Sequence, residues 1–145
     1  MPAEQTDFLN VDLDVVSRVS LEPLVAALGD RVIVLHIGRE GRRHSAHLEA
    51  GGSVYKMDAD RRVRRLVALV KSLPAAARAL WNKAESREFN VGIQAGLRPR
   101  ASEFRLRSET LAAVASVRGQ VVITVYAPVG APRAVQSRTG RPTSG

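Results

Sequence analysis

The strongest constraint on the fold is a regular alternation of apolar and polar residues near the N-terminus. Within Phe8–Val16, the apolar residues Leu9, Val11, Leu13 and Val15 alternate with Asn10, Asp12 and Asp14. A period of two predicts a β-strand with one buried face and one polar face. Sheets that keep a polar face are typically covered by helices on the other side only. We therefore expect this strand to belong to a sheet with one solvated, acidic face.

Four more segments predict strands. They are Arg31–Ile37, Arg42–Ala50, Phe89–Leu97 and Val121–Val125. The first two flank the turn-like Gly38-Arg39-Glu40-Gly41, which predicts a hairpin. With Glu40-Gly41 as a two-residue turn, Leu35 lies opposite Ala46 and Ile33 opposite Leu48. This register predicts one apolar face made of Ile33, Leu35, Ile37, Ala46 and Leu48.

Helix signals separate these strands. Ser20 is expected to cap a short helix that contains Pro23 and ends at Gly29. Asp58 is expected to cap the longest helix, which has an apolar stripe on one side and basic residues on the other. The stripe consists of Val63, Leu66, Val67, Val70 and Leu73. Pro74 predicts a kink there, or a second helix that starts at Ser72.

The second half of the chain adds a core anchor and one more helix. Trp81 lies on an apolar line and is interpreted as part of the core. The stretch 98–107 is expected to be a basic connector in which Phe104 and Leu106 form a short strand. Ser108 is expected to cap a helix that ends near Gly119. The glycines of the fourth strand leave its outward side bare, so we expect another group to pack closely on it.

Together these elements predict an α+β fold. The order is that of a ferredoxin-like core (β-α-β-β-α-β) with an added α-β unit, and the sheet is mixed or antiparallel with helices on one face. A chain of 145 residues, 45% of them hydrophobic, suits one globular domain. We expect that domain to span residues 1–126. Residues 127–145 are rich in Pro, Gly, Ser and Arg and are expected to form a disordered tail.

Composition limits the classes of function. The chain has no cysteine, which excludes disulfides, thiol catalysis and thiolate metal sites. No apolar run is long enough for a membrane span, and the N-terminal residues, with Glu4 and Asp7, do not resemble a signal peptide. We therefore expect a cytoplasmic protein that does not bind membranes. Its 22 Lys and Arg against 14 Asp and Glu give a net charge of +8, so a polyanionic partner has to be considered.

Three segments resemble a bacterial family of small α+β proteins known only as a domain of unknown function. They are Phe89-Asn90-Val91-Gly92-Ile93-Gln94-Ala95-Gly96, Ser108-Glu109-Thr110-Leu111 and Val122-Ile123-Thr124-Val125-Tyr126. The resemblance implies a shared fold over Phe8–Tyr126 and no established catalytic residues. It also implies a binding role, because some similar small domains are immunity proteins that neutralise toxins.

Two groups of residues resemble a metal or acid/base site. Asp12 and Asp14 share one face of a strand and could hold Mg²⁺ or Ca²⁺ together. In the hairpin register given above, His36, His47 and Glu49 share the face away from the apolar one, as in a two-histidine, one-carboxylate site. The alternative is an ordinary polar face, and we favour it because no further acidic cluster, phosphate-binding loop or nucleophile elbow accompanies these residues. We therefore assign no catalytic, cofactor-binding or metal-binding residue and expect no cofactor.

The basic residues are the most suggestive group. A polyanion-contacting surface is predicted from the hairpin and the long helix, with further arginines in the connector at positions 98, 100, 105 and 107. Its residues are Arg42, Arg43, Arg61, Arg64, Arg65 and Lys71. Aromatic residues make up only 4% of the chain, so a stacking platform for single strands is poorly supplied. The alternative is that the charge serves solubility and reflects the composition of a GC-rich genome.

The sequence therefore favours a non-catalytic protein-binding or regulatory module, for example an immunity-like protein, whose partner is another protein. The first alternative is a nucleic-acid-binding protein that uses the arginines. The second is a small metal-dependent enzyme that uses the acidic strand or the histidines. The oligomeric state is left open.

Overall fold

The computed structural model describes residues 5–128 and has an α+β fold with a mixed five-stranded sheet and four α-helices. The strands are β1 (Asp7–Ser17), β2 (Val32–Glu40), β3 (Arg43–Ala50), β4 (Ser86–Gln94) and β5 (Gln120–Tyr126). The helices are α1 (Glu22–Leu28), α2 (Ala59–Lys71), α3 (Ala75–Lys83) and α4 (Ser108–Ser116), and a 3₁₀ turn, Gly29–Arg31, follows α1. None of the helices among these residues has the length and hydrophobicity that crossing a bilayer requires.

The strands lie in the order β2-β3-β1-β4-β5. The pairs β2/β3, β3/β1 and β1/β4 are antiparallel, and only β4/β5 is parallel. The α+β class and the mixed sheet are thus confirmed. The strand order of the whole sheet differs from that of a four-stranded ferredoxin-like sheet, because β5 extends it beyond β4.

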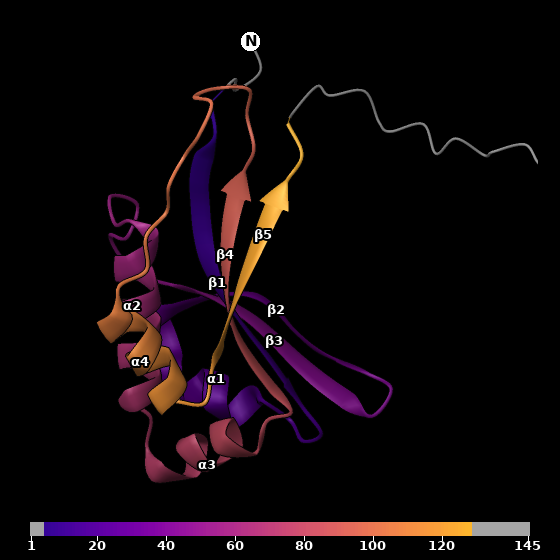
Figure 1. Cartoon of the computed structure of the whole chain (residues 1–145). Helices are drawn as coiled ribbons and strands as arrows, with labels where there is room; N and C mark the ends of the chain where they lie inside the picture. The colour runs from indigo at the N-terminus through magenta and orange to yellow at the C-terminus, as the bar shows by residue number, and fades with distance from the viewer. Residues whose placement is uncertain (1–4, 129–145) are drawn as a thin grey trace, which may run out of the picture.

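The helices lie on one side of the sheet, which we call the helix face, and the opposite side is the outer face (Figure 1). The alternation in β1 has the predicted consequence: Val11, Leu13 and Val15 are buried, and the polar residues between them are half-buried on the outer face. Helix α2 packs against β1 and β3 with its apolar stripe, while Arg61, Arg64 and Arg65 are exposed. Asp58 caps α2 as predicted, since its side chain accepts the N–H of Arg61 at 2.9 Å.

Trp81 of α3 anchors the core. It is fully buried, lies edge-on to Phe89 at a centroid distance of 6.3 Å, and donates its indole N–H to the carbonyl oxygen of Val117 at 2.8 Å. The bond satisfies the one polar atom that an indole brings into a core. The same bond connects α3 to the turn between α4 and β5, although Trp81 and Val117 lie 36 residues apart in the sequence.

The predicted hairpin register is wrong. The turn residues are Gly41 and Arg42 rather than Glu40 and Gly41, so Glu40 pairs with Arg43. A β-bulge between Val34 and His36 shifts the register again. An extra residue in one strand moves every following side chain to the other face. Consequently the expected single apolar face does not form: Val34 lies opposite Leu48 and Ile37 opposite Ala46, but Ile33 lies opposite Glu49 on the outer face.

Other boundaries also differ from the predictions. Leu21 and Arg107, rather than Ser20 and Ser108, occupy the N-cap positions of α1 and α4. A separate helix follows Pro74, but it starts at Ala75: Pro74 is its N-cap residue, with a φ of −58° that suits the proline ring and an extended ψ of 157°. The connector 98–107 contains no strand. The predicted disordered tail lies outside the described residues from position 129 onward.

Candidate functional site

The outer face of the sheet carries a hydrogen-bonded network of polar side chains. Asn10 lies opposite Gly92, where a Cβ would come within 2.7 Å of its side-chain oxygen. The close packing expected on the bare side of β4 is thus the packing of Asn10 on Gly92. From this position the Asn10 amide donates to Glu49 Oε1 at 2.5 Å and to Asp12 Oδ1 at 3.2 Å. A larger residue at position 92 would displace the amide that links these two carboxyl groups.

Asp12 has an unusual protonation equilibrium. It lies directly opposite Glu49 on β3 and two residues from Asp14 on its own strand. Burial and the negative charges of Glu49 and Asp14 raise the pKa of Asp12 from 3.8 to about 6. Both causes act by disfavouring the ionised carboxylate. The outer face therefore holds a carboxyl group that changes charge just below neutral pH.

The histidines form a second part of this network. His47 Nδ1 lies 2.6 Å from Asp14 Oδ1, and the rings of His36 and His47 lie 5.5 Å apart across the β2/β3 pair. The structure thus brings His36 and His47 together, as the sequence suggested. Glu49, however, interacts with Asn10 rather than with the histidines. Among residues 5–128 no three His, Asp or Glu side chains are arranged to hold a metal ion.

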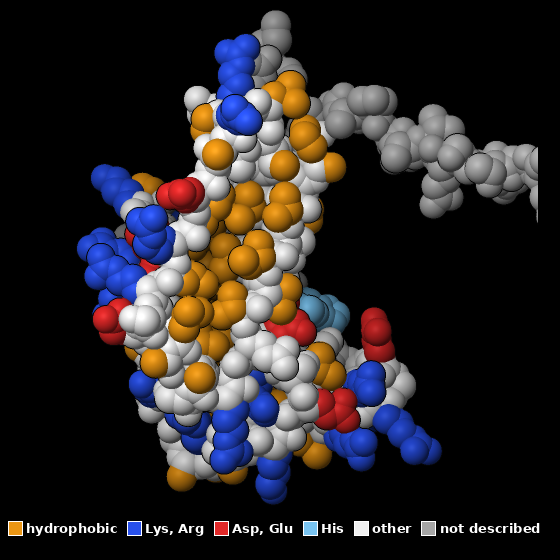
Figure 2. All heavy atoms as spheres, viewed as in Figure 1, with side chains coloured by type: hydrophobic (Ala, Val, Ile, Leu, Met, Phe, Trp, Pro, Cys, Tyr) orange, Lys and Arg blue, Asp and Glu red, His pale blue; other side chains and the backbone are white. Residues whose placement is uncertain are grey.

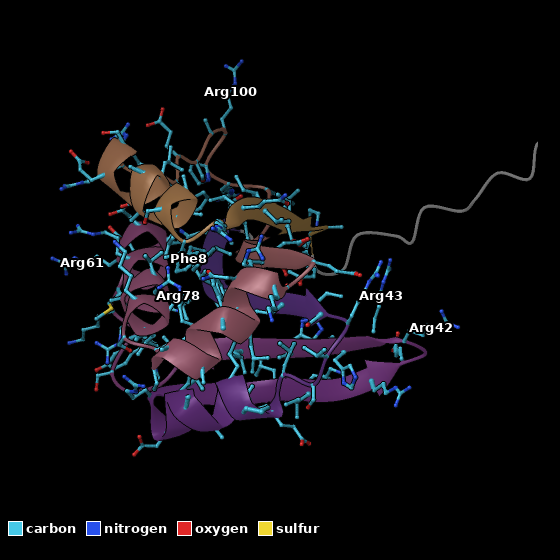
Figure 3. All side chains as sticks on the ribbon, turned by 90° about the horizontal axis from the view of Figure 1, so that it is seen from below. Phe8, Arg42, Arg43, Arg61, Arg78 and Arg100 are labelled. Carbon is cyan, nitrogen blue, oxygen red and sulfur yellow. The ribbon has the colours of Figure 1, made fainter. Side chains whose placement is uncertain are left out.

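The predicted polyanion-contacting residues fall into separate groups. Arg42 and Arg43 lie at the tip of the β2–β3 hairpin, whereas Arg61 lies on the far side of the molecule on α2 (Figure 3). Arg64 and Arg65 line the same surface as Arg61, and Lys71 is the last residue of α2. The six residues therefore do not form one continuous patch.

The hairpin-tip group borders a shallow basin of about 630 Å³. Its walls are formed by Arg18, Arg39, Arg42, Arg43, His44 and Glu85. Glu85 binds Arg18 at 2.6 Å and Arg43 at 3.2 Å, and the hydrogen bond from Arg18 lowers the pKa of Glu85. Arg18, Arg39, His44 and Glu85 were not predicted for this site. The run Arg39-Glu40-Gly41-Arg42-Arg43 is a local signal for a basic hairpin tip, but nothing near positions 18 or 85 indicates that they join it.

The arginines of α2 border a second basin, of about 300 Å³. Arg61, Arg64, Arg105 and Arg107 line it together with Asp58 and Asp60. Asp60 accepts the backbone N–H of Arg107 at 2.8 Å, which holds the connector against the first turn of α2. Burial opposes ionisation of Asp60, but this N–H and the charges of Arg64 and Arg107 lower its pKa overall. Two of the basic residues here therefore have an acidic neighbour within the fold.

The β2–β3 hairpin also exposes apolar side chains. It extends beyond the helices (Figure 1), and β2 forms one edge of the sheet. Four large apolar residues of this one strand are exposed, namely Ile33 (51%), Val34 (43%), Leu35 (51%) and Ile37 (38%). Ile33, Leu35 and Ile37 were expected to share one apolar face with Ala46 and Leu48. The bulge separates Ile33 from Ile37, which lies opposite the buried Ala46 and is still 38% exposed.

Comparison with protein-family models, with curated proteins and with solved structures finds no match to this chain.

Proposed function

We propose that this protein is a non-catalytic protein-binding module that binds its partner through the β2–β3 hairpin. One observation carries the proposal: an edge strand with four exposed apolar residues ends at a rim of arginines. Val34 and Ile37 lie on the helix face and Ile33 on the outer face, so this edge offers apolar surface on both sides of the sheet. Exposed apolar surface with a polar rim is typical of protein-binding sites, where arginine is enriched. The partner surface would be apolar with an acidic border, and the net charge of +8 would speed its approach.

An edge strand also offers the partner a row of backbone groups. In strand addition, an extended segment of the partner pairs with the edge, and its side chains meet the apolar residues on either face. The bulge between Val34 and His36 interrupts this row. We therefore place the pairing segment of the partner beside Val32–Val34, and its acidic residues beside the hairpin tip.

The second candidate function is nucleic-acid binding, favoured by the two arginine-lined basins. Phosphate groups would fit either basin by charge. Exposed aromatic residues, on which bases stack, are few: Tyr55 and Tyr126 are exposed, and Phe104 is partly so. We rank this function second because the basins lie on different sides of the molecule.

The resemblance to the bacterial family of unknown function is consistent with a binding role and stays a proposal. We propose in the same way that β1 to β4 correspond to a ferredoxin-like core to which α4 and β5 are added. Support comes from the connections, which run β1-α1-β2-β3, then α2 and α3, then β4. The cytoplasm is the proposed location, supported by the absence of cysteine.

A capture experiment tests the proposed function. The immobilised protein is compared with two hairpin variants, Leu35→Ser and Arg42→Glu/Arg43→Glu, and with the matched control Arg64→Glu/Arg65→Glu on α2. We expect one protein from the source organism to bind the wild type and the control and to be lost with both hairpin variants. Direct titration of the purified partner should then show at least a tenfold weaker affinity for each hairpin variant. Equal capture by all four proteins would refute the role of the hairpin.

A randomised oligonucleotide pool at two salt concentrations distinguishes the second candidate. A protein-binding module should bind all sequences weakly, with Kd of roughly 10⁻⁴ to 10⁻⁶ M near physiological salt. Enrichment of one sequence or structure by about 10³-fold at fixed salt is expected only of a nucleic-acid-binding protein. That result, lost in either arginine double variant, would overturn the proposed function.

A further inference from the structure

Strand β5 is an unprotected edge of the sheet. Among the described residues it has a strand neighbour on one side only, β4. Its sequence, Gln-Val-Val-Ile-Thr-Val-Tyr, contains no charged residue and no proline. Edge strands of monomeric proteins are normally guarded by charges, prolines or bulges, because an open edge pairs with other chains. The opposite edge, β2, is open over Val32–Val34 only, because a bulge follows Val34 and the charged residues Arg39 and Glu40 lie at its end.

The side chains of β5 continue the core of the sheet, and no other described segment covers them. Ile123 lies beside Val91 and Val125 beside Ile93, so both face the same side as the core residues of β4. Val91 and Ile93 are 3% and 8% exposed, whereas Ile123 and Val125 are 61% and 60% exposed. Figure 2 shows hydrophobic side chains gathered over β1, β4 and β5 in the centre of the view. The helices thus cover the core row on β4 but not its continuation on β5.

Within residues 5–128, the outward backbone groups of β5 also have no partner, at the residues whose side chains are uncovered. The carbonyl oxygen of Tyr126 accepts the N–H of Ala95, which follows β4, so Tyr126 turns its backbone groups toward β4. Backbone direction alternates along a strand, so Thr124 and Val122 also face β4. Val121, Ile123 and Val125 therefore point their N–H and C=O groups away from the sheet. These are the three residues whose side chains lie on the helix face.

We propose that β5 is a self-association site at which two copies of this chain pair antiparallel about a two-fold axis at Ile123. The strand is nearly symmetric about that residue. Val121 would meet Val125 of the second copy, Val122 would meet Thr124, and Gln120 would meet Tyr126. Each of the outward-facing residues would take part in a hydrogen-bonded pair, giving about six backbone hydrogen bonds. The exposed apolar side chains of the two β5 strands would then form one continuous row on the helix face.

Charge supports a second copy as the occupant and predicts its salt dependence. The interface itself has no charged side chain to repel an identical strand. The remaining opposition is the net charge of +8 on each copy, and salt screens charges that lie far apart. Self-association should therefore strengthen as salt rises. Binding of an anionic partner to the arginines would weaken under the same change.

Sedimentation velocity of the full chain at several concentrations and two salt concentrations tests the proposal. We expect a dimer that dissociates on dilution and is favoured at higher salt. Ile123→Lys should weaken it at least tenfold, whereas the matched control Ile33→Lys, on the other edge strand, should leave it unchanged. A wild type that stays monomeric at all concentrations would overturn the proposal. A dimer lost with Ile33→Lys but not with Ile123→Lys would do the same.

A single-cysteine variant tests the geometry independently of affinity. The chain contains no cysteine, so Ile123→Cys introduces the sole thiol. In a hydrogen-bonded antiparallel pair the two Cα atoms at the axis would lie about 5.5 Å apart, within the range that a disulfide spans. We expect Ile123→Cys to form a covalent dimer under mild oxidation and Ile33→Cys to form none. Equal cross-linking of both variants would contradict pairing through β5. Retention of the dimer in the hairpin variants above would separate this inference from the proposed function.

Discussion

Replacing Asp12 by asparagine should stabilise the protein at neutral pH. Asp12 is half-buried on the outer face, opposite Glu49 and next to Asp14, and its pKa is raised to about 6. The ionised form therefore costs free energy in the folded state that it does not cost in the unfolded chain. Asparagine has the same shape, still accepts the Asn10 amide and adds an N–H donor for Glu49. The substitution removes the charge and keeps the hydrogen bonds.

The magnitude follows from the pKa. The difference between 3.8 and about 6 corresponds to about 3 kcal/mol of unfavourable ionisation. Asp12 is only partly buried, and screening by water reduces this to about 1 kcal/mol. Because the folded-state pKa is raised, the wild type loses this stability as pH rises from about 4 to about 6, and the loss is complete at pH 7.5. At pH 4 the folded wild type is protonated at Asp12 and should match the variant.

Urea unfolding at pH 4 and pH 7.5 measures the effect, and Asp30→Asn, on the 3₁₀ turn after α1, serves as a control for loss of one negative charge. We expect the free energy of unfolding of Asp12→Asn to exceed that of the wild type by about 1 kcal/mol at pH 7.5, or about 3 °C in Tm. The difference should vanish at pH 4. A variant that is less stable than the wild type at pH 7.5 would show that ionised Asp12 is favourably paired and that the reasoning is wrong.

Three further predictions concern the core and the metal hypothesis. Trp81→Phe should destabilise the protein by about 3 kcal/mol, because it leaves a small cavity and an unpaired carbonyl at Val117; chemical unfolding checks this, and a loss below about 1 kcal/mol would contradict the anchor role. Gly119→Ala should cost about 1–3 kcal/mol in the same assay, since its Cβ would come within 2.5 Å of the Phe89 ring, and an unchanged stability would mean that the ring moves freely. Calorimetric titration with Zn²⁺, Mg²⁺ and Mn²⁺ should show no specific binding. A micromolar affinity that His47→Ala abolishes would instead support the hypothesis of a metal-dependent enzyme.

The features that could be predicted from the sequence are those encoded by neighbouring residues. The alternation in β1, the apolar stripe of α2 and the Asp58 cap each involve residues at most four positions apart, or a repeat of that spacing. Burial of Trp81 follows from the same local pattern, because a large apolar residue on an apolar line has only the core to face. Such signals give the elements, their buried faces and hence the α+β class.

Only the tertiary structure decided how these elements meet, and the candidate sites depend on that. The bulge in β2, which leaves Leu35 without a counterpart on β3, exists only in the pairing of the two strands. Glu85 joins the arginines of the hairpin tip, and Asn10 reaches Glu49, only because distant strands are neighbours in the sheet. The open edge at β5 likewise depends on the strand order. Cross-strand register is set by the packing of whole faces and by turn geometry, to which residues far apart in the chain contribute together, so no short stretch of sequence specifies it.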